Sequence, residues 1–252
     1  AEAQFYPNDY DGIWASCPAI NWTQFLASGL WAVTVMNEYD HILGFHKINA
    51  FRDAVHNSVG GKENYFQVEE RIDFDPYTIL GQKTKGGKIT EKDCLVMQEI
   101  WKGPHTTGND FLWYSFLPGG TFWNKIIPIG SFYYPLIGKR PKCFSLVEQY
   151  VHLAFEDPKK DLLHLKIRDF EKVFDTCIRK LGWLSCDHAD LRPFANAGGK
   201  LIIDHGLDDP LIPVEGTIDY YHHMREIHGG QNFIDRFCRL YINPGDGHGN
   251  CH

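Results

Sequence analysis

The strongest constraint on the fold lies near the end of the sequence, where two short apolar segments flank a helical pattern. The first reads KLIIDHG at 200–206, and the second reads RLYI at 239–242. Residues 214–227 between them favour a helix. A strand, a helix and a strand joined by short links form a βαβ unit, whose strands are parallel members of one sheet. The sequence therefore predicts an α/β fold with a parallel sheet.

A further strand is predicted close to the start of the chain. The short apolar run GIWA at 12–15 follows turn residues and is typical of a strand covered on both faces. Between this strand and the βαβ unit, helical patterns dominate. We therefore expect an α/β-hydrolase core, present in part as residues 1–26 and 186–252, with a large, mainly helical lid insertion at 27–185.

Three patterns support helices within the expected lid. Apolar residues at 170, 173, 174, 177, 178 and 181 fall on one helix face. The spacings Thr90 to Asp93 and Ser145 to Glu148 are typical of capping boxes at helix starts. An aromatic-rich stretch at 101–134 either forms the lid core or provides a stacking wall for a flat ligand. We expect most of these rings to lie in the core and one or two to line a pocket.

Charge and hydropathy exclude two classes of partner. The net charge is −7, and the lysines and arginines are scattered instead of forming the basic stripe that nucleic-acid binding needs. The longest mainly apolar stretch, residues 25–36, is shorter than the roughly 20 residues of a membrane-spanning helix. We expect neither a nucleic-acid nor a membrane partner.

Polar side chains follow the two strands of the βαβ unit. Asp209 comes after the strand that ends at Gly206, and His248 comes after the second strand. Functional groups in α/β sheets lie at the carboxyl ends of strands, and the order Asp then His fits the last two members of a hydrolase triad. An Asp-Pro turn and a structural histidine in a glycine-rich loop remain the alternatives.

The nucleophile of such a triad is a serine on a Gly-x-Ser-x-Gly turn between a strand and a helix. This chain contains no such motif. The nearest imitation, HNSVG at 56–60, lacks the first glycine and follows no predicted strand, so we reject it. The sequence therefore predicts no nucleophile within this chain.

The remaining histidines give no metal site. We expect His222, His223 and His228, on or just after the predicted helix 214–227, to face solvent. His248, Cys251 and His252 do not match a standard zinc spacing. We predict no bound metal.

Both ends of the chain resemble the tannase and feruloyl esterase family. The opening AEAQFYPNDYDGIWASCPAINWTQF is similar to the stretch directly after that family's nucleophile. The segment DLRPFANAGGKLIIDHGLDDPLIPVEGTIDYY resembles its acid-bearing strand and helix, and RLYINPGDGHGNC resembles its histidine loop. Fainter echoes lie between them in IDFDPYTIL, CLVMQEIWKGP and FLPGG.

The resemblance implies a serine-type carboxylic ester hydrolase that acts through an acyl-enzyme. Asp209 matches the catalytic acid and His248 the catalytic base, whereas the family's serine would lie shortly before Ala1. The chain is therefore expected to be a middle part of a longer enzyme. The implied substrates are feruloyl, p-coumaroyl or galloyl esters derived from plant cell walls or polyphenols, with no organic cofactor.

Two departures from the family pattern concern cysteine and calcium. In the family a cysteine directly follows the catalytic histidine and bridges to the cysteine beside the serine. Gly249 holds that position here, which leaves Cys251 as the candidate for the bridge. The family's lid calcium loop corresponds to residues 56–76, which have lost its cysteines and most of its aspartates, so we predict no lid calcium.

Two questions stay open at this level. With seven cysteines the chain is compatible with the secretion typical of the family, and we expect a secreted protein. The rival to an esterase is a non-catalytic module that binds a phenolic or carbohydrate ligand on a degenerate hydrolase fold. A nucleophile motif upstream of Ala1 would favour the esterase.

Overall fold

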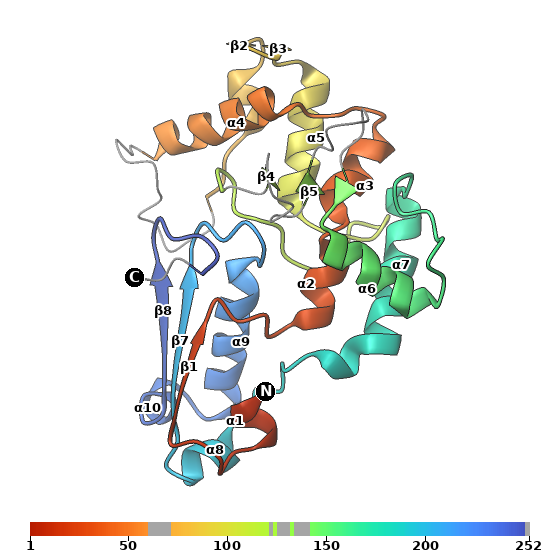
Figure 1. The fold of residues 1–252 in the computed structure, drawn as a ribbon. Helices are drawn as coiled ribbons and strands as arrows, with labels where there is room; N and C mark the ends of the chain where they lie inside the picture. Colours follow the sequence, from red (N-terminus) through yellow and green to blue (C-terminus); the bar gives the residue numbers. More distant parts are fainter. Residues whose placement is uncertain (60–71, 121–122, 125–131, 134–141, 250–252) are drawn as a thin grey trace.

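The parallel sheet expected from the βαβ pattern is present in the computed structural model of the chain (Figure 1), which describes residues 1–59, 72–120, 123–124, 132–133 and 142–249. The α/β elements are α1 (Glu2–Phe5), β1 (Gly12–Ser16), α8 (Arg192–Asn196), β7 (Lys200–Gly206), α9 (Val214–Ile227), α10 (Gln231–Ile234) and β8 (Cys238–Asn243). The helices of the intervening region are α2 (Trp22–Ser28), α3 (Trp31–Glu38), α4 (Phe45–Ser58), η1 (Pro76–Ile79), α5 (Glu91–Lys102), α6 (Ser145–Phe155), α7 (Ile167–Leu181) and η2 (Gly182–Leu184). Its short strands are β2 (Lys83–Thr84), β3 (Gly87–Lys88), β4 (Trp123–Asn124), β5 (Phe132–Tyr133) and β6 (Lys142–Cys143).

The main sheet has the order β1-β7-β8 among the described residues, and both pairings are parallel. Leu201 of β7 lies opposite Ile13 on one side and Cys238 on the other. The predicted strands and the bounds predicted for helix α9 are confirmed. All three strands run in one direction, so their carboxyl ends meet at one edge.

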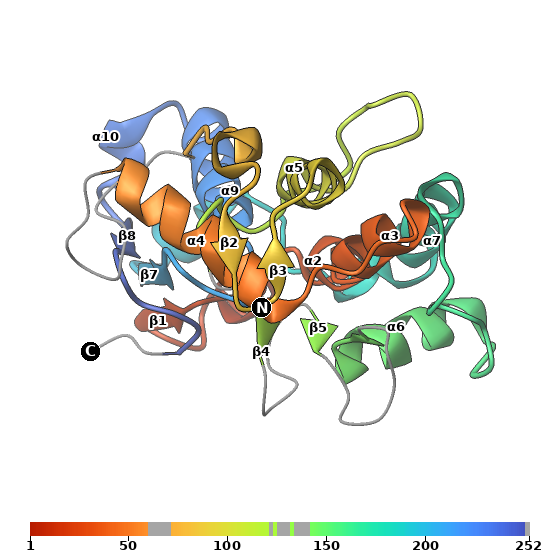
Figure 2. The ribbon, with the colours of Figure 1, turned by 90° about the horizontal axis from the view of Figure 1, so that it is seen from above.

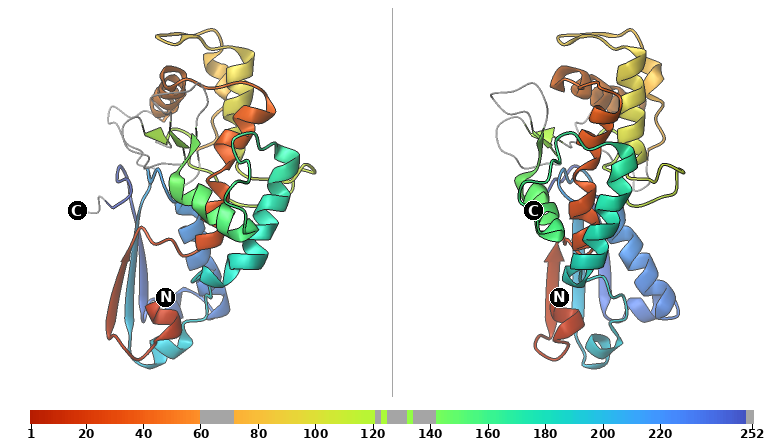
Figure 3. Two further views of the ribbon diagram at one scale, coloured as in Figure 1. Left: turned by 45° about the vertical axis from the view of Figure 1, so that its right-hand side comes forward. Right: turned by 90° about the vertical axis from the view of Figure 1, so that its right-hand side faces the viewer.

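Helix α9 lies along one face of this sheet (Figure 3). Phe194, Ile203 and Met224 belong to the apolar cluster that fills the space between strands and helices. The opposite face carries exposed side chains, among them Trp14, which is 70% exposed, and Tyr241. The prediction that β1 is covered on both faces is therefore wrong within the described residues, because the face that carries Trp14 is exposed.

The intervening region is mainly helical, as predicted. In Figure 2, α3, α6 and α7 lie to one side of the main sheet β1-β7-β8. Helix α7 buries Phe170, Val173 and Cys177 on one face, which confirms the periodicity of its sequence. The same apolar cluster also takes in Leu207 from the segment after β7, so helices and sheet share part of a core. The boundaries 1–26, 27–185 and 186–252 stay a prediction.

Only one of the two predicted capping boxes forms. The side chain of Thr90 accepts a hydrogen bond from the Asp93 amide, while the Asp93 carboxylate accepts one from the Thr90 amide. Ser145 is instead the first residue of α6, whose N-cap is Phe144 and has no side-chain cap. The prediction at Ser145 is wrong because a capping box needs the serine at the non-helical position before the helix.

Asp93 also ties the start of α5 to the preceding segments. Its side chain is fully buried and accepts hydrogen bonds from Lys47 Nζ at 2.6 Å and His41 Nε2 at 2.8 Å. Burial raises the pKa of Asp93, but the hydrogen bonds from Lys47, Thr90 and His41 outweigh burial and lower it. The carboxylate is therefore ionised and joins three separate segments of the chain.

We expect Asp93→Ala to lower the free energy of unfolding by about 3–5 kcal/mol, because it breaks the ion pair of this buried carboxylate with the half-buried Lys47 ammonium and removes the acceptor of the Thr90 amide. Urea denaturation followed by circular dichroism measures this loss. The matched control is Asp110→Ala, since Asp110 caps an exposed turn through Thr106. Equal losses in the two variants would contradict the role given to Asp93.

No disulfide links the described cysteines, and the described helices are too short or too polar to span a membrane. Six cysteines lie in the described residues, and no two of these six form a disulfide. Cys251, for which a bridge was predicted, lies outside the described residues. Within the part of the chain that the structure describes, no helix is both long and apolar enough to cross a bilayer.

Candidate active site

Two loops at the carboxyl edge of the sheet lie against each other. One follows β7 and contains Asp209, and the other is the histidine loop, residues 244–249, which follows β8. The Leu207 amide donates to the Asn243 carbonyl at 3.0 Å, and the Asp208 amide donates to the Asp246 carbonyl at 3.0 Å. These bonds extend the parallel ladder beyond the strands and fix the distance between the loops.

A glycine at the end of β7 makes this close approach feasible. A Cβ at Gly206 would lie 2.6 Å from the Gly247 carbonyl oxygen and still closer to that of Asp246. Real Cβ atoms essentially never come so near to backbone oxygens, so any larger residue would push the histidine loop away. Gly206 is therefore a condition for the geometry of this edge.

The carboxylate of Asp209 is buried and held on both oxygens. Its Oδ1 accepts hydrogen bonds from the backbone amides of Leu211 at 2.8 Å and Ile212 at 2.9 Å. Its Oδ2 faces two imidazole rings, those of His205 and His248. Asp209 therefore stabilises the Asp-Pro turn, which was the alternative considered from the sequence. It is also the partner of the predicted histidine, His248.

His248 meets Asp209 as the order of residues in the sequence predicts. The distance from His248 Nδ1 to Asp209 Oδ2 is 2.9 Å, and the His248 side chain is 35% exposed. An ionised carboxylate is only an acceptor, so Nδ1 carries the proton and donates it. The Nε2 atom is left with a lone pair, which is the state a general base needs.

His205 was missed in the sequence although it touches the same oxygen. Its Nε2 lies 3.1 Å from Asp209 Oδ2, and its Nδ1 lies 2.8 Å from the Thr217 hydroxyl. Both the imidazole and the carboxylate are fully buried. The signal in the sequence was a histidine four residues before Asp209 at the end of an apolar strand. We infer that His205, itself hydrogen-bonded to Thr217, holds the Asp209 carboxylate in place.

The hydrogen bonds of this cluster shift two pKa values in opposite directions. Burial raises the pKa of Asp209, but hydrogen bonds from His205 and His248 outweigh burial and lower it to about 2. The hydrogen bond to Asp209 raises the pKa of His248, and partial burial opposes this effect. Near neutral pH Asp209 is therefore a carboxylate, and its hydrogen bond favours the protonated form of His248.

The other polar residues considered in the sequence lie elsewhere. Ser58 ends helix α4, where its hydroxyl donates to the Val55 carbonyl at 2.7 Å, so it does not lie on a turn between a strand and a helix. His222 and His223 are exposed as predicted, but His228 is buried against Phe233 and Phe237. The prediction for His228 is wrong because its Nδ1 pairs with the Met224 carbonyl at 2.7 Å, which lets the ring leave solvent. Cys251 and His252 lie outside the described residues.

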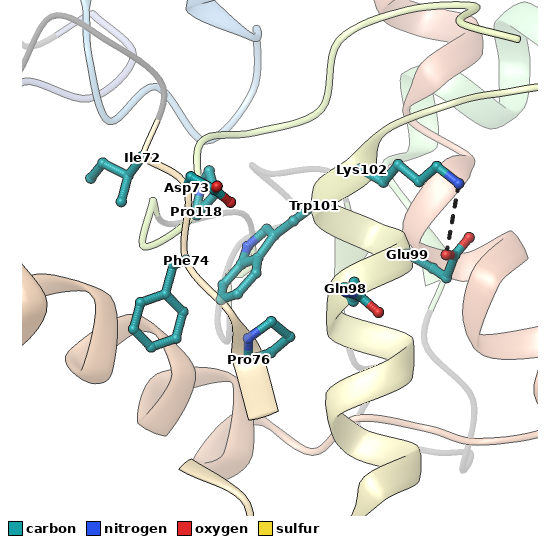
Figure 4. Close-up of a pocket in the computed structure, with 9 residues that line it drawn as sticks. All are labelled: Ile72, Asp73, Phe74, Pro76, Gln98, Glu99, Trp101, Lys102 and Pro118. Atoms are coloured by element: carbon teal, nitrogen blue, oxygen red, sulfur yellow. Dashed lines mark ion pairs between the residues drawn. The ribbon is translucent and has the colours of Figure 1, made fainter. Parts of the chain in front are cut away.

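Helix α5 borders a cavity of about 610 Å³ (Figure 4). The indole ring of Trp101 lies between this helix and the segment that carries Phe74 and Pro76. Trp101 and Trp113 are buried and Trp101 also lines the cavity, whereas Tyr114 and Phe116 are half-buried and Phe111 is exposed. The expectation of a ring that lines a pocket is confirmed, and the expectation that most rings lie in the core is confirmed only in part. Of the described residues that line the cavity, none is Asp209 or His248. Phe122, Tyr134 and residues 60–71, which belong to the segment 56–76 compared with the family's calcium loop, lie outside the described residues.

Comparison with known proteins finds similar sequences and structures. The sequence model of the family described as "Tannase and feruloyl esterase" matches residues 139–252, which include both predicted site residues. A probable feruloyl esterase of Arthroderma benhamiae is 29% identical over 98% of this chain and 47% of its own length. Feruloyl esterase C of Talaromyces stipitatus is 24% identical over 97% of this chain and 46% of its own. The chain thus spans about half the length of these relatives.

Solved structures share the fold. Feruloyl esterase B from Aspergillus oryzae matches with a TM-score of 0.80 and 20% identity, over 98% of this chain and 49% of the other. Tannin acyl hydrolase from Aspergillus niger matches with the same TM-score of 0.80 and 22% identity. These likenesses confirm the predicted α/β class with its parallel sheet. The sequence matches show that residues 139–252 are similar to the tannase and feruloyl esterase family, and the solved structures show that the chain shares their fold.

Proposed function

We propose that this chain supplies the acid and base of a carboxylic ester hydrolase that acts on phenolic-acid esters. Asp209 orients His248, and His248 takes a proton from a serine that lies outside the 252 residues of this chain. The proposal is carried by one observation: the 2.9 Å contact between His248 Nδ1 and the buried Asp209 Oδ2. Relatives named as feruloyl esterases and a tannin acyl hydrolase support the substrate class.

The proposed mechanism uses His248 twice. Its Nε2 first accepts the serine proton as the hydroxyl attacks the ester carbonyl, and then passes the proton to the leaving alcohol. Water next hydrolyses the acyl-enzyme, with His248 again as base. Throughout both steps Asp209 stays ionised and stabilises the imidazolium, which its low pKa of about 2 favours. Residues 27–185 would form the lid that selects the acyl group.

A fluorophosphonate probe tests the proposal against its rival, a non-catalytic module that binds phenolic or carbohydrate ligands. The probe forms a covalent bond only with an activated serine, so we expect the full-length protein to be labelled. The His248→Ala variant of the same protein should lose the label, since its serine has no base. A full-length protein that binds ferulate but takes up no label would support the binding module.

The raised pKa of His248 predicts how activity depends on pH. His248 must be neutral to accept a proton, so kcat/KM should fall as pH decreases through its pKa. The hydrogen bond to Asp209 places this inflection above the ordinary histidine value of 6.5. A profile of methyl ferulate hydrolysis by the full-length protein reports the pKa of the free enzyme. An inflection below the ordinary value would contradict the paired geometry.

Secretion and the aromatic ester partner are part of the same proposal. An enzyme that releases phenolic acids from plant cell walls or polyphenols meets its substrate outside the cell. We therefore propose that the full-length protein is secreted. Immunodetection in culture medium and in washed cells checks this, and retention of all the protein inside the cells would contradict it.

A further inference from the structure

Three side chains of the kinds that bind zinc meet beneath the histidine loop. Ligand atoms of Cys17, His205 and Asp209 all lie within 4.8 Å of one another, and the three residues are buried. Cys17 follows β1 directly, while His205 and Asp209 come from the end of β7 and the loop after it. Because β1 and β7 are parallel neighbours, their carboxyl ends bring these groups to one edge of the sheet.

We propose that Cys17, His205 and Asp209 form a site for a thiophilic divalent cation such as Zn²⁺, and that its occupation inactivates the Asp209–His248 pair. Thiolate sulfur, imidazole nitrogen and carboxylate oxygen are the ligands that zinc prefers in proteins. One thiolate and one carboxylate balance the two positive charges of the ion. The occupied site would therefore be neutral, as a buried site must be.

The distances require little movement. In tetrahedral zinc sites the ligand atoms are about 3.3–3.8 Å apart, as follows from metal–ligand bonds of about 2.0–2.3 Å. His205 Nε2 and Asp209 Oδ2 are 3.1 Å apart, and the ligand atoms of Cys17, His205 and Asp209 all lie within 4.8 Å of one another. Small side-chain shifts would thus bring the three ligands to zinc-binding distances.

Neighbouring groups already orient two of the ligands. The amides of Leu211 and Ile212 hold Asp209 Oδ1, which directs Oδ2 toward His205. When His205 Nε2 binds the ion, its proton moves to Nδ1, where the Thr217 hydroxyl at 2.8 Å accepts it. Cys17 releases its thiol proton to solvent. Such outer partners typically strengthen metal binding by about 10–100-fold.

Inhibition follows from the shared oxygen. Asp209 Oδ2 accepts the hydrogen bond of His248 Nδ1, so an ion on Oδ2 competes directly with that bond. His248 then loses the partner that fixes its tautomer, and Nε2 no longer serves as the base. The inhibition rests on the proposed function of Asp209 and His248, whereas the binding does not.

The binding is tested with cadmium and the full-length protein. Cadmium bound to a thiolate gives an ultraviolet charge-transfer band, which we expect to saturate at one ion per protein. Cys17→Ala and Cys17→Ser should both remove the band. Two variants are used so that a folding defect in one of them does not decide the result. Cys186→Ala is the matched control, since Cys186 is a half-buried thiol on a different segment, and it should keep the band. A band that survives in both Cys17 variants would overturn the site.

The inhibition is tested with zinc and methyl ferulate. Zinc should abolish hydrolysis by the full-length protein, and a chelator should restore it. Cys17→Ala should raise the half-inhibitory zinc concentration by more than about 100-fold, since it removes a ligand outright. Equal zinc sensitivity in Cys17→Ala and the parent would overturn the proposal. If the cadmium band requires Cys17 but the metal-free protein hydrolyses no ester, the metal site is supported and the proposed function is refuted.

Discussion

Asp209→Asn should reduce ester hydrolysis by the full-length protein by about 10⁴-fold, the loss known for the equivalent change in a serine protease triad. The amides of Leu211 and Ile212 both donate to Oδ1, so the asparagine must keep its oxygen there. Its NH₂ group then takes the place of Oδ2 and faces His248. Two donors cannot pair, so His248 shifts its proton to Nε2 and loses the lone pair that accepts the serine proton.

The matched control for this variant is Asp208→Asn. Asp208 is the adjacent acidic residue, and the same change of charge there leaves the Oδ2 contact with His248 intact. Steady-state hydrolysis of methyl ferulate and methyl gallate measures both variants. A loss in Asp208→Asn as large as that in Asp209→Asn would show that charge near the loop matters, and not the orientation of His248.

Gly206→Ala should impair both folding and activity. Its methyl group would meet the carbonyl oxygens of Asp246 and Gly247 at distances that real Cβ atoms do not show. Relief of this clash moves the histidine loop, at a cost of about 1–3 kcal/mol in the free energy of unfolding. A displacement of about 1 Å at a catalytic group costs roughly 10²-fold in rate. Thermal unfolding and methyl ferulate hydrolysis of the full-length protein measure the two effects.

Gly12→Ala is the control for the loop displacement. Gly12 lies on β1 of the same sheet, and a Cβ there would lie 4.0 Å from the Lys200 carbonyl oxygen, an ordinary contact. This variant should keep the activity of the parent. If Gly206→Ala hydrolysed methyl ferulate as fast as Gly12→Ala, the close approach of the two loops would not matter for catalysis.

The elements predicted best from the sequence were those with a periodic or short-range pattern. Helix α9 has the bounds that were predicted for it, and the paired strands β7 and β8 follow from the βαβ arrangement. The meeting of Asp209 with His248 was also predicted, because parallel strands deliver their following loops to one edge. These properties depend on local sequence and chain direction alone.

The predictions that failed depend on side-chain contacts that form only when the chain folds back on itself. Whether β1 is covered depends on the surfaces packed against it, and the burial of His228 depends on Phe233 and Phe237. His205 looked like part of an apolar strand, because only the folded chain shows that its nitrogens meet Asp209 and Thr217. Contacts of this kind leave no periodic pattern in the sequence.

The most direct test of the central claim is the rate of methyl ferulate hydrolysis by full-length His248→Ala, compared with His223→Ala on the exposed face of α9. If His248 is the base, its loss lowers kcat/KM by several orders of magnitude, while His223→Ala retains the parent rate. Near-normal hydrolysis in His248→Ala would contradict the assignment of the Asp209–His248 pair.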